Sequence, residues 1–218
     1  MTSPFALRKP SLEDVAAFLA AHDALLVHFS GTPKGGGSSF NAAFPFDLQA
    51  VMQGQAQGGL SASVVSPLDE FNNLTRANAT GCVGLVLRLR SPESLVAVSP
   101  PDCGSVVEDG IRKVLHEKDI DAADLNLSIS ARGHNASHFY NEWVVRDFEV
   151  AGVFAMPPLR IMRWNAPWPD DTPSELKDAG PTGWTFGATS IAEISAAFPG
   201  LPLFTFREGK HHRHDQQS

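Results

Sequence analysis

The sequence predicts an α+β domain built on a mixed, mainly antiparallel β-sheet with flanking helices. Short apolar runs typical of strands are interleaved irregularly with segments of helical period, and no repeating strand–helix–strand unit is maintained. The 218 residues, of which 43% are hydrophobic, suit one globular core. We therefore expect a single domain over residues 1–207, with its core at about 11–156, followed by a flexible tail over 208–218.

The N-terminal part predicts helices and strands in alternation. Ser11 and Asp14 have the spacing of a capping box, and Val15 and Phe18 fall on one face of the helix that would follow. The run LSASVV alternates as a half-buried strand does. The elements expected here are a helix from Ser11, strands at 24–29 and 60–65, and a second helix at 46–54 beyond a glycine-rich loop at 31–39.

The middle of the chain carries the strongest strand signal. The run YNEWVVRDFEVAGVFA is rich in aromatic and β-branched residues, and Asp147 inside it is expected to mark a hairpin or a bulge. Asp121 is expected to begin a helix. The elements expected here are strands at 83–89, 94–98, 141–146 and 148–155, and a helix at 121–132.

The composition changes after Met156. Pro, Trp and Asp become frequent without a clear period, so we expect an irregular wrap across the surface of the domain, because each Pro removes a ladder donor and each Trp needs apolar cover. A short helix at 190–198 and a strand at 203–206 would complete this Pro/Trp-rich C-terminal wrap, which we place at 157–207.

Composition also disfavours several classes of protein. A formal net charge of −7 repels phosphate, which disfavours broad nucleic-acid binding. No apolar run reaches the roughly 18 residues of a membrane span, and the first residues lack the apolar segment of a signal peptide. We expect no membrane partner, and a location in the cytoplasm or delivery into a target cell by a secretion system. The 2 cysteines are too few for a disulfide framework or a metal cluster.

Two titratable residues are candidates for chemistry. Glu142 lies among aromatic and β-branched residues, where a carboxylate is costly to bury without a partner. It either points outward at a strand edge, on an exposed face shared with Arg146, or faces a cleft with its pKa adjusted for catalysis. His28 ends an apolar strand just before a loop, where a histidine is either a satisfied core residue or a functional one.

The histidines near the C-terminus do not predict a metal site. His211, His212 and His214 lie in a polar terminal stretch, whereas a metal site needs ligands that are fixed in space by further hydrogen bonds. We therefore expect these residues to be surface histidines and the protein to hold no metal.

Three segments, LLVHFSGT, GGLSASVV and YNEWVV, together resemble the core of the ADP-ribosyltransferase superfamily, in its diphtheria-toxin and poly-ADP-ribose-polymerase branch. The resemblance implies a split β-sheet, NAD as co-substrate, and a bacterial toxin or effector that modifies a protein or nucleic-acid acceptor. It assigns catalysis to Glu142. The residues that it assigns to NAD binding are His28, Ser30, Gly31, Ser61, Ser63 and Tyr140.

The sequence also departs from the family pattern. Phe29 replaces the glycine that usually follows the histidine, and Ser61 or Ser63 must serve where other members carry a tyrosine in the second strand. Tyr140 stands two residues before Glu142, where arginine-modifying members carry Gln or Glu. On this resemblance arginine is not the expected acceptor.

The implied chemistry is consistent with these residues. Breaking the bond between nicotinamide and ribose develops positive charge on the ribose, and the fixed carboxylate of Glu142 would stabilise that charge. His28 would hold the adenosine-side ribose, Ser61 or Ser63 the nicotinamide side, and the loop at 31–39 would close over the dinucleotide.

Three other interpretations of the sequence remain open. Water in place of a macromolecular acceptor would make the protein an NAD glycohydrolase. A non-enzymatic interaction domain would present Trp164, Trp168 and Trp184 to a partner. A metal hydrolase would use the C-terminal histidines.

Overall fold

The computed structural model describes about half of the chain. The described residues are 7–29, 59–66, 83–99, 107–108, 111–112, 119–130, 142–155, 160–163, 185–188, 190–207 and 210–215. The helix expected at 46–54, the loop at 31–39 and most of the Pro/Trp-rich wrap lie outside them.

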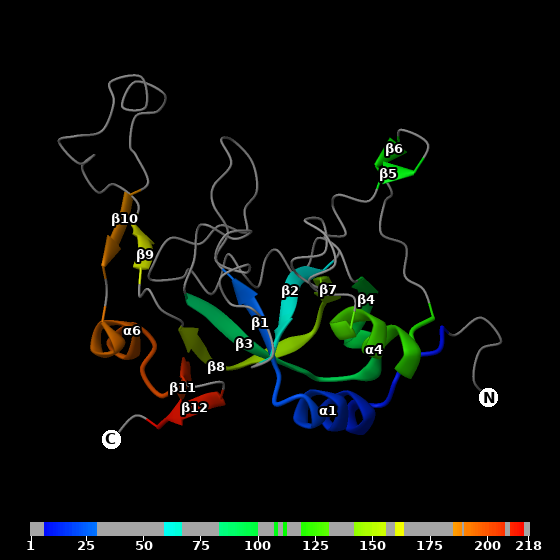
Figure 1. The fold of residues 1–218 in the computed structure, drawn as a ribbon, viewed down its shortest axis with the longest axis horizontal. Helices are drawn as coiled ribbons and strands as arrows, with labels where there is room; N and C mark the ends of the chain where they lie inside the picture. The colour runs from blue at the N-terminus through cyan, green and yellow to red at the C-terminus, as the bar shows by residue number, and fades with distance from the viewer. Residues whose placement is uncertain are drawn as a thin grey trace.

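The described strands form one eight-stranded sheet, in the order β12-β11-β8-β3-β1-β2-β7-β4, and two small two-stranded sheets (Figure 1). Neighbours in the large sheet are antiparallel, except that β8 and β11 are parallel. The predicted α+β class with a mixed, mainly antiparallel sheet is therefore confirmed. The strands of the large sheet are β1 (Leu25–Phe29), β2 (Leu60–Val65), β3 (Val83–Leu89), β4 (Leu95–Ser99), β7 (Glu142–Val145), β8 (Phe148–Ala155), β11 (Leu203–Arg207) and β12 (Lys210–His214). The small sheets pair β5 (Val107–Glu108) with β6 (Ile111–Arg112), and β9 (Arg160–Arg163) with β10 (Thr185–Ala188).

The helices among the described residues begin at side-chain caps. They are α1 (Leu12–Ala21), α4 (Ala122–Ser130) and α6 (Ile191–Ala197), with a single 3₁₀ turn, η1 (Pro92–Ser94). Each cap accepts a backbone N–H that the helix cannot satisfy, which stabilises it by about 1 kcal/mol. The cap distances are 3.1 Å from Ser11 Oγ to Asp14 N, 3.1 Å from Asp121 Oδ1 to Asp124 N and 3.1 Å from Ser190 Oγ to Glu193 N. None of these helices combines the length and apolar character needed to cross a membrane.

The connection between β7 and β8 forces the large sheet to bend. Only Arg146 and Asp147 separate the two strands, yet β2, β1 and β3 lie between them in the sheet. In a flat sheet four spacings of about 4.8 Å would put β7 and β8 about 19 Å apart. The three steps from Val145 to Phe148 reach at most about 11 Å. The sheet therefore curves so that β7 and the start of β8 approach each other.

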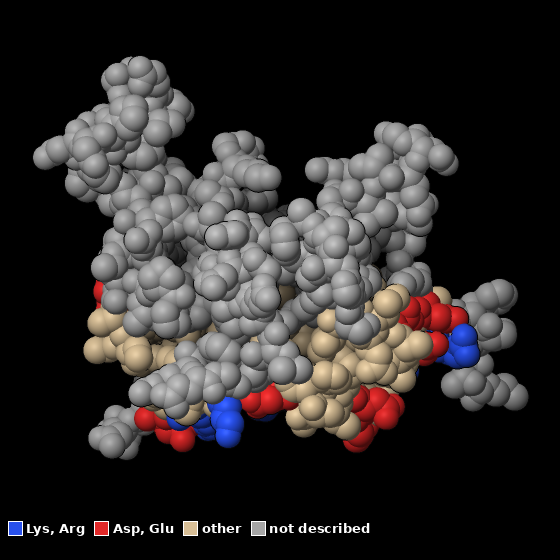
Figure 2. Space-filling model, viewed as in Figure 1, with Lys and Arg blue, Asp and Glu red and all other residues tan. Residues whose placement is uncertain are grey.

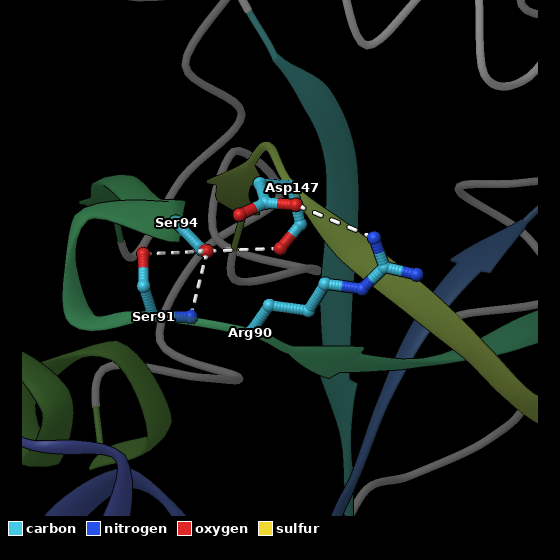
Figure 3. Close-up of polar contacts among 4 residues, drawn as sticks. All are labelled: Arg90, Ser91, Ser94 and Asp147. Atoms are coloured by element: carbon cyan, nitrogen blue, oxygen red, sulfur yellow. Dashed lines mark hydrogen bonds and ion pairs between the residues drawn. The ribbon is translucent and has the colours of Figure 1, made fainter.

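Asp147 forms the corner of this bend (Figure 3). Its backbone has φ 45°, and its carbonyl accepts hydrogen bonds from Arg90 N at 3.2 Å and from Ser94 Oγ at 2.9 Å. Ser94 Oγ also accepts from Ser91 N at 3.1 Å, and Ser94 O accepts from Arg146 N at 2.9 Å. The predicted hairpin or bulge at Asp147 is therefore wrong, because β7 and β8 pair with other strands and meet only at this corner.

The C-terminal region differs in part from the prediction. The helix expected at 190–198 and the strand expected at 203–206 are present as α6 and β11. The flexible tail expected at 208–218 is wrong for Lys210–His214, which form β12 and pair with β11 from Leu203↔His214 to Arg207↔Lys210. The run KHHRH is entirely polar, so its sequence carries no alternation from which a strand could be recognised. Within β12 the half-buried ring of His211 lies edge-on to Phe154, with 5.9 Å between the ring centroids.

We expect Ser94→Ala to destabilise the protein by about 1–3 kcal/mol, because Ser94 is 1% exposed and its hydroxyl makes one of the two hydrogen bonds to the Asp147 carbonyl and accepts the Ser91 N–H. Urea unfolding measures the change. Ser91→Ala is the matched control, since its more exposed hydroxyl contacts only Ser94 Oγ in this corner, and it should shift the midpoint much less. If both variants unfold at the same urea concentration as the wild type, the hydrogen bonds of Ser94 at the Asp147 corner do not stabilise the protein.

Burial lowers the pKa of His211 below its ordinary value of 6.5, although the nearby Asp23 opposes the shift. The unfolded chain therefore binds more protons than the native chain between the lowered pKa and about 6.5, so stability is full above that interval and is lost as the pH falls through it. Urea midpoints measured from pH 7 to pH 5 should fall less in His211→Phe than in the wild type. The exposed neighbour His212, changed to Gln, should keep the wild-type dependence. An unchanged pH dependence in His211→Phe would show that another group is responsible.

Candidate functional site

Glu142 is a buried carboxylate on an interior strand. It is the first residue of β7, it is 7% exposed, and its Cα pairs with Ser63 on β2 and with Ser99 on β4. Because β7 is paired on both sides, the alternative in which Glu142 points outward at a strand edge is excluded, although Arg146 itself is exposed. Enclosing a carboxylate is costly unless charge or hydrogen bonds compensate it.

Ser61 and Ser63 share the face of the sheet that carries Glu142. Ser63 stands directly opposite Glu142, and Ser61 is opposite Val144. Directly opposed residues have Cβ atoms about 5 Å apart on the same face, so a hydroxyl at Ser63 is within reach of the carboxylate. Ser63 is buried at 6% exposure, whereas Ser61 is exposed. The structure therefore brings these three predicted site residues together.

The sheet forks beside this cluster. The ladder of β1 with β2 covers Leu25–Val27, whereas the ladder of β1 with β3 covers Val27–Phe29. Beyond Ser63, β2 continues along β7 as far as Leu60. The strands β1 and β2 therefore lie side by side at one end and separate at the other (Figure 1). By its register with Ser63, which pairs with Val27, Glu142 lies at the start of this separation.

His28 is the first residue of β1 past the fork. It is 4% exposed, and its Nδ1 lies 2.7 Å from the backbone oxygen of Ser61 across the opening between β1 and β2. A carbonyl oxygen only accepts, so Nδ1 carries the proton, and Nε2 is the acceptor nitrogen when the ring is neutral.

His28 and Glu142 point to opposite faces of their strands. His28 pairs with Leu85 and follows Val27, whereas Glu142 lies in register with Ser63 and Val27. Because side chains alternate along a strand, His28 is on the core side with Leu85. Along the strands, the register of His28 thus differs from that of Glu142 by one residue, next to the point where β1 and β2 separate. Their side chains are not on one face of the sheet. Ser30, Gly31 and Tyr140 lie outside the described residues.

Gly59 allows β2 to approach β7 at the start of the paired region. Its φ is +121°, and a Cβ there would lie 2.6 Å from Val144 Cγ1 and 3.3 Å from Val145 O. A residue with a side chain would therefore be strained and would push the two strands apart. Gly59, which precedes the run LSASVV, is thus a packing requirement of the site.

Trp143 anchors β7 to the helices on the other face of the sheet. Its indole is fully buried, its Nε1–H donates to Ser128 Oγ on α4 at 3.2 Å, and its ring stacks on Phe18 of α1 with 6.0 Å between centroids. The alternation of side chains along a strand predicts that Trp143 lies on the face opposite Glu142. It does not predict Ser128, because a serine within a helix gives no signal of its tertiary partner.

A cavity of about 420 Å³ lies where α1 and α4 begin, and it does not include Glu142. Acidic side chains gather over this part of the surface (Figure 2). These carboxylates already have partners. Asp14 accepts from Ser11 N at 3.3 Å and from Ser11 Oγ at 2.8 Å, and Asp121 caps α4. The backbone N–H of Arg8, at 2.7 Å, lowers the pKa of Asp119. The cavity therefore belongs to the junction of two helix starts and not to the candidate site.

The described residues contain no group of three or more His, Cys, Asp or Glu side chains arranged to hold a metal ion. On β12, His212 and His214 share one side of the strand, and His211 lies on the other.

Comparison of the chain with protein-family models, curated proteins and solved structures finds no match.

Proposed function

We propose that the protein is an ADP-ribosyltransferase, which breaks the bond between nicotinamide and ribose in NAD and transfers ADP-ribose to a macromolecular acceptor. One observation carries the proposal. The three segments that resemble the superfamily are far apart in sequence, yet they occupy the adjacent strands β1, β2 and β7 and bring His28, Ser63 and Glu142 to neighbouring levels of one fork.

The position of Glu142 suits the chemistry of this reaction. Departure of nicotinamide leaves positive charge on the ribose ring, as in glycoside cleavage. A carboxylate held on an interior strand, away from bulk water, stabilises such a charge more strongly than one in solution. Its oxygens would accept a hydrogen bond from a ribose hydroxyl while facing the developing cation.

The neighbouring residues would hold the dinucleotide. Ser63, directly opposite Glu142, and the exposed Ser61 would bind the nicotinamide side. His28 lies on the core side of the sheet, so it would contact the adenosine-side ribose through the opening between β1 and β2. Its hydrogen bond to Ser61 O fixes which ring nitrogen donates, and this defines the orientation in which the ring meets NAD.

The shape of the sheet also supports an ADP-ribosyltransferase-like arrangement. The bend at Asp147 and the fork at Val27 divide the hydrogen-bonded sheet into a half containing β2, β7 and β4 and a half containing β3, β8, β11 and β12, with β1 shared between them. A split sheet of this kind is what the resemblance implies. NAD would lie where the halves separate, in a bacterial toxin or effector that acts on a protein or nucleic acid.

We expect Glu142→Gln and Glu142→Ala to remain folded and to lose nicotinamide release by about 10²-fold or more, because the charge that opposes the ribose cation is removed. Chromatographic assay of nicotinamide from NAD measures the loss. Glu149→Gln is the control, since this half-exposed glutamate on β8 pairs with Arg88 at 2.7 Å and should keep wild-type activity. If both Glu142 variants release nicotinamide at the wild-type rate, Glu142 is not the catalytic carboxylate.

Turnover without an acceptor separates a transferase from an NAD glycohydrolase. With NAD alone we expect slow nicotinamide release and little free ADP-ribose. With labelled NAD and a cell lysate, the label should enter a macromolecule that mass spectrometry can identify. Fast hydrolysis of NAD alone, with no labelled macromolecule, would show that water is the acceptor.

A further inference from the structure

The indole of Trp143 is held in one direction by a short chain of hydrogen bonds. Trp143 Nε1–H donates to Ser128 Oγ at 3.2 Å, and Ser128 Oγ donates to the carbonyl oxygen of Leu125 at 2.7 Å. A hydroxyl has one proton, so the bond to Leu125 directs that proton along α4 and leaves a lone pair for the indole. Trp143 and Ser128 are both 0% exposed, so no water competes for these groups.

The same ring is packed against a second helix. Phe18 of α1 stacks on it, with 22° between the ring planes, and the Cα of Trp143 pairs with Ala62 and Val98 in the neighbouring strands. The indole therefore lies in a fixed slot between the sheet and two helices. It is the largest of the fully buried side chains among the described residues, so it resists rotation more than a smaller residue in this slot would.

Trp143 and Glu142 are linked directly through the backbone of β7. They are consecutive residues on opposite faces of β7, so a rotation of the strand about its axis displaces both side chains. Glu142 is the first residue of the strand, and Trp143 is therefore the first side chain that ties this end of β7 to the helices. The other end of β7 is tied separately, at the Asp147 corner.

We propose that the hydrogen-bonded pair Trp143–Ser128 is a positioning device that sets the carboxylate of Glu142 against the ribose of NAD. This inference rests on the proposed function. Neither residue touches NAD; the pair acts through the strand that carries Glu142. Displacement of a catalytic group by about 1 Å can slow a reaction by about 10²-fold, so a small rotation of β7 is enough to matter.

The test compares Ser128→Ala, Trp143→Phe and the double variant. Trp143→Phe keeps an aromatic ring against Phe18 but removes the N–H donor. We expect both single variants to lower kcat for nicotinamide release by about 10-fold while the Kd for NAD changes less than about 2-fold, because binding groups stay and orientation is lost. The double variant should be no slower than the single variants, since both then lack the same bond.

Ser66→Ala is the matched control for loss of a buried hydroxyl. Ser66 is 1% exposed, and its Oγ donates to His22 O at the end of α1, away from β7. It should lower the Tm without lowering kcat. If Ser128→Ala does not fold, kcat and the Kd for NAD measured in Trp143→Phe still test the proposal.

The outcomes separate the two proposals. Lower kcat at an unchanged Kd, with a double variant no slower than the single ones, supports the positioning pair. Suppose that the wild type releases nicotinamide and Glu142→Gln does not. If kcat is then unchanged in Ser128→Ala and Trp143→Phe, or if the two effects on kcat multiply in the double variant, only the positioning pair is overturned. If the wild type releases no nicotinamide, the proposed function fails, and the positioning pair fails with it.

Discussion

The short connection between β7 and β8 constrains the whole molecule. Two residues join strands that are four positions apart in the sheet, so the sheet has to curve. Asp147 makes this possible by adopting a left-handed backbone conformation, and its carbonyl binds the backbone N–H of Arg90 and the hydroxyl of Ser94. Within the curved sheet, β1 pairs with β2 over Leu25–Val27 and with β3 over Val27–Phe29, so the two ladders part at Val27.

The candidate site lies beside this fork. Burial on an interior strand raises the energetic cost of the Glu142 carboxylate unless charge or hydrogen bonds compensate it, and in the proposed function this carboxylate faces the ribose cation. The two faces of β7 have different surroundings. The Trp143 face supplies packing against α1 and α4. Among the described residues, Val144 on the Glu142 face clusters with Val96 and Ala97, and Ser61 and Ser63 lie opposite this face of β7.

Local signals in the sequence were sufficient for most strands and helix starts. The alternation in LSASVV and the capping residues Ser11 and Asp121 depend on neighbours in the chain, so β2, α1 and α4 were predicted correctly. Asp147 was misread because a positive φ at this residue fits a hairpin as well as a corner, and only the pairing partners of β7 and β8 distinguish the two. Ser128 was missed and β12 was read as a tail because both depend on tertiary partners that no local pattern encodes.

The most direct test of the account is a crystal structure of the Glu142→Gln protein with NAD bound. We expect the nicotinamide ribose to lie within hydrogen-bond distance of residue 142, with Ser63 beside it and His28 on the adenosine side of the dinucleotide. A dinucleotide bound instead in the cavity at the start of α1 and α4, or no binding of NAD at millimolar concentration, would contradict the proposal that the fork between β1 and β2 is an NAD site.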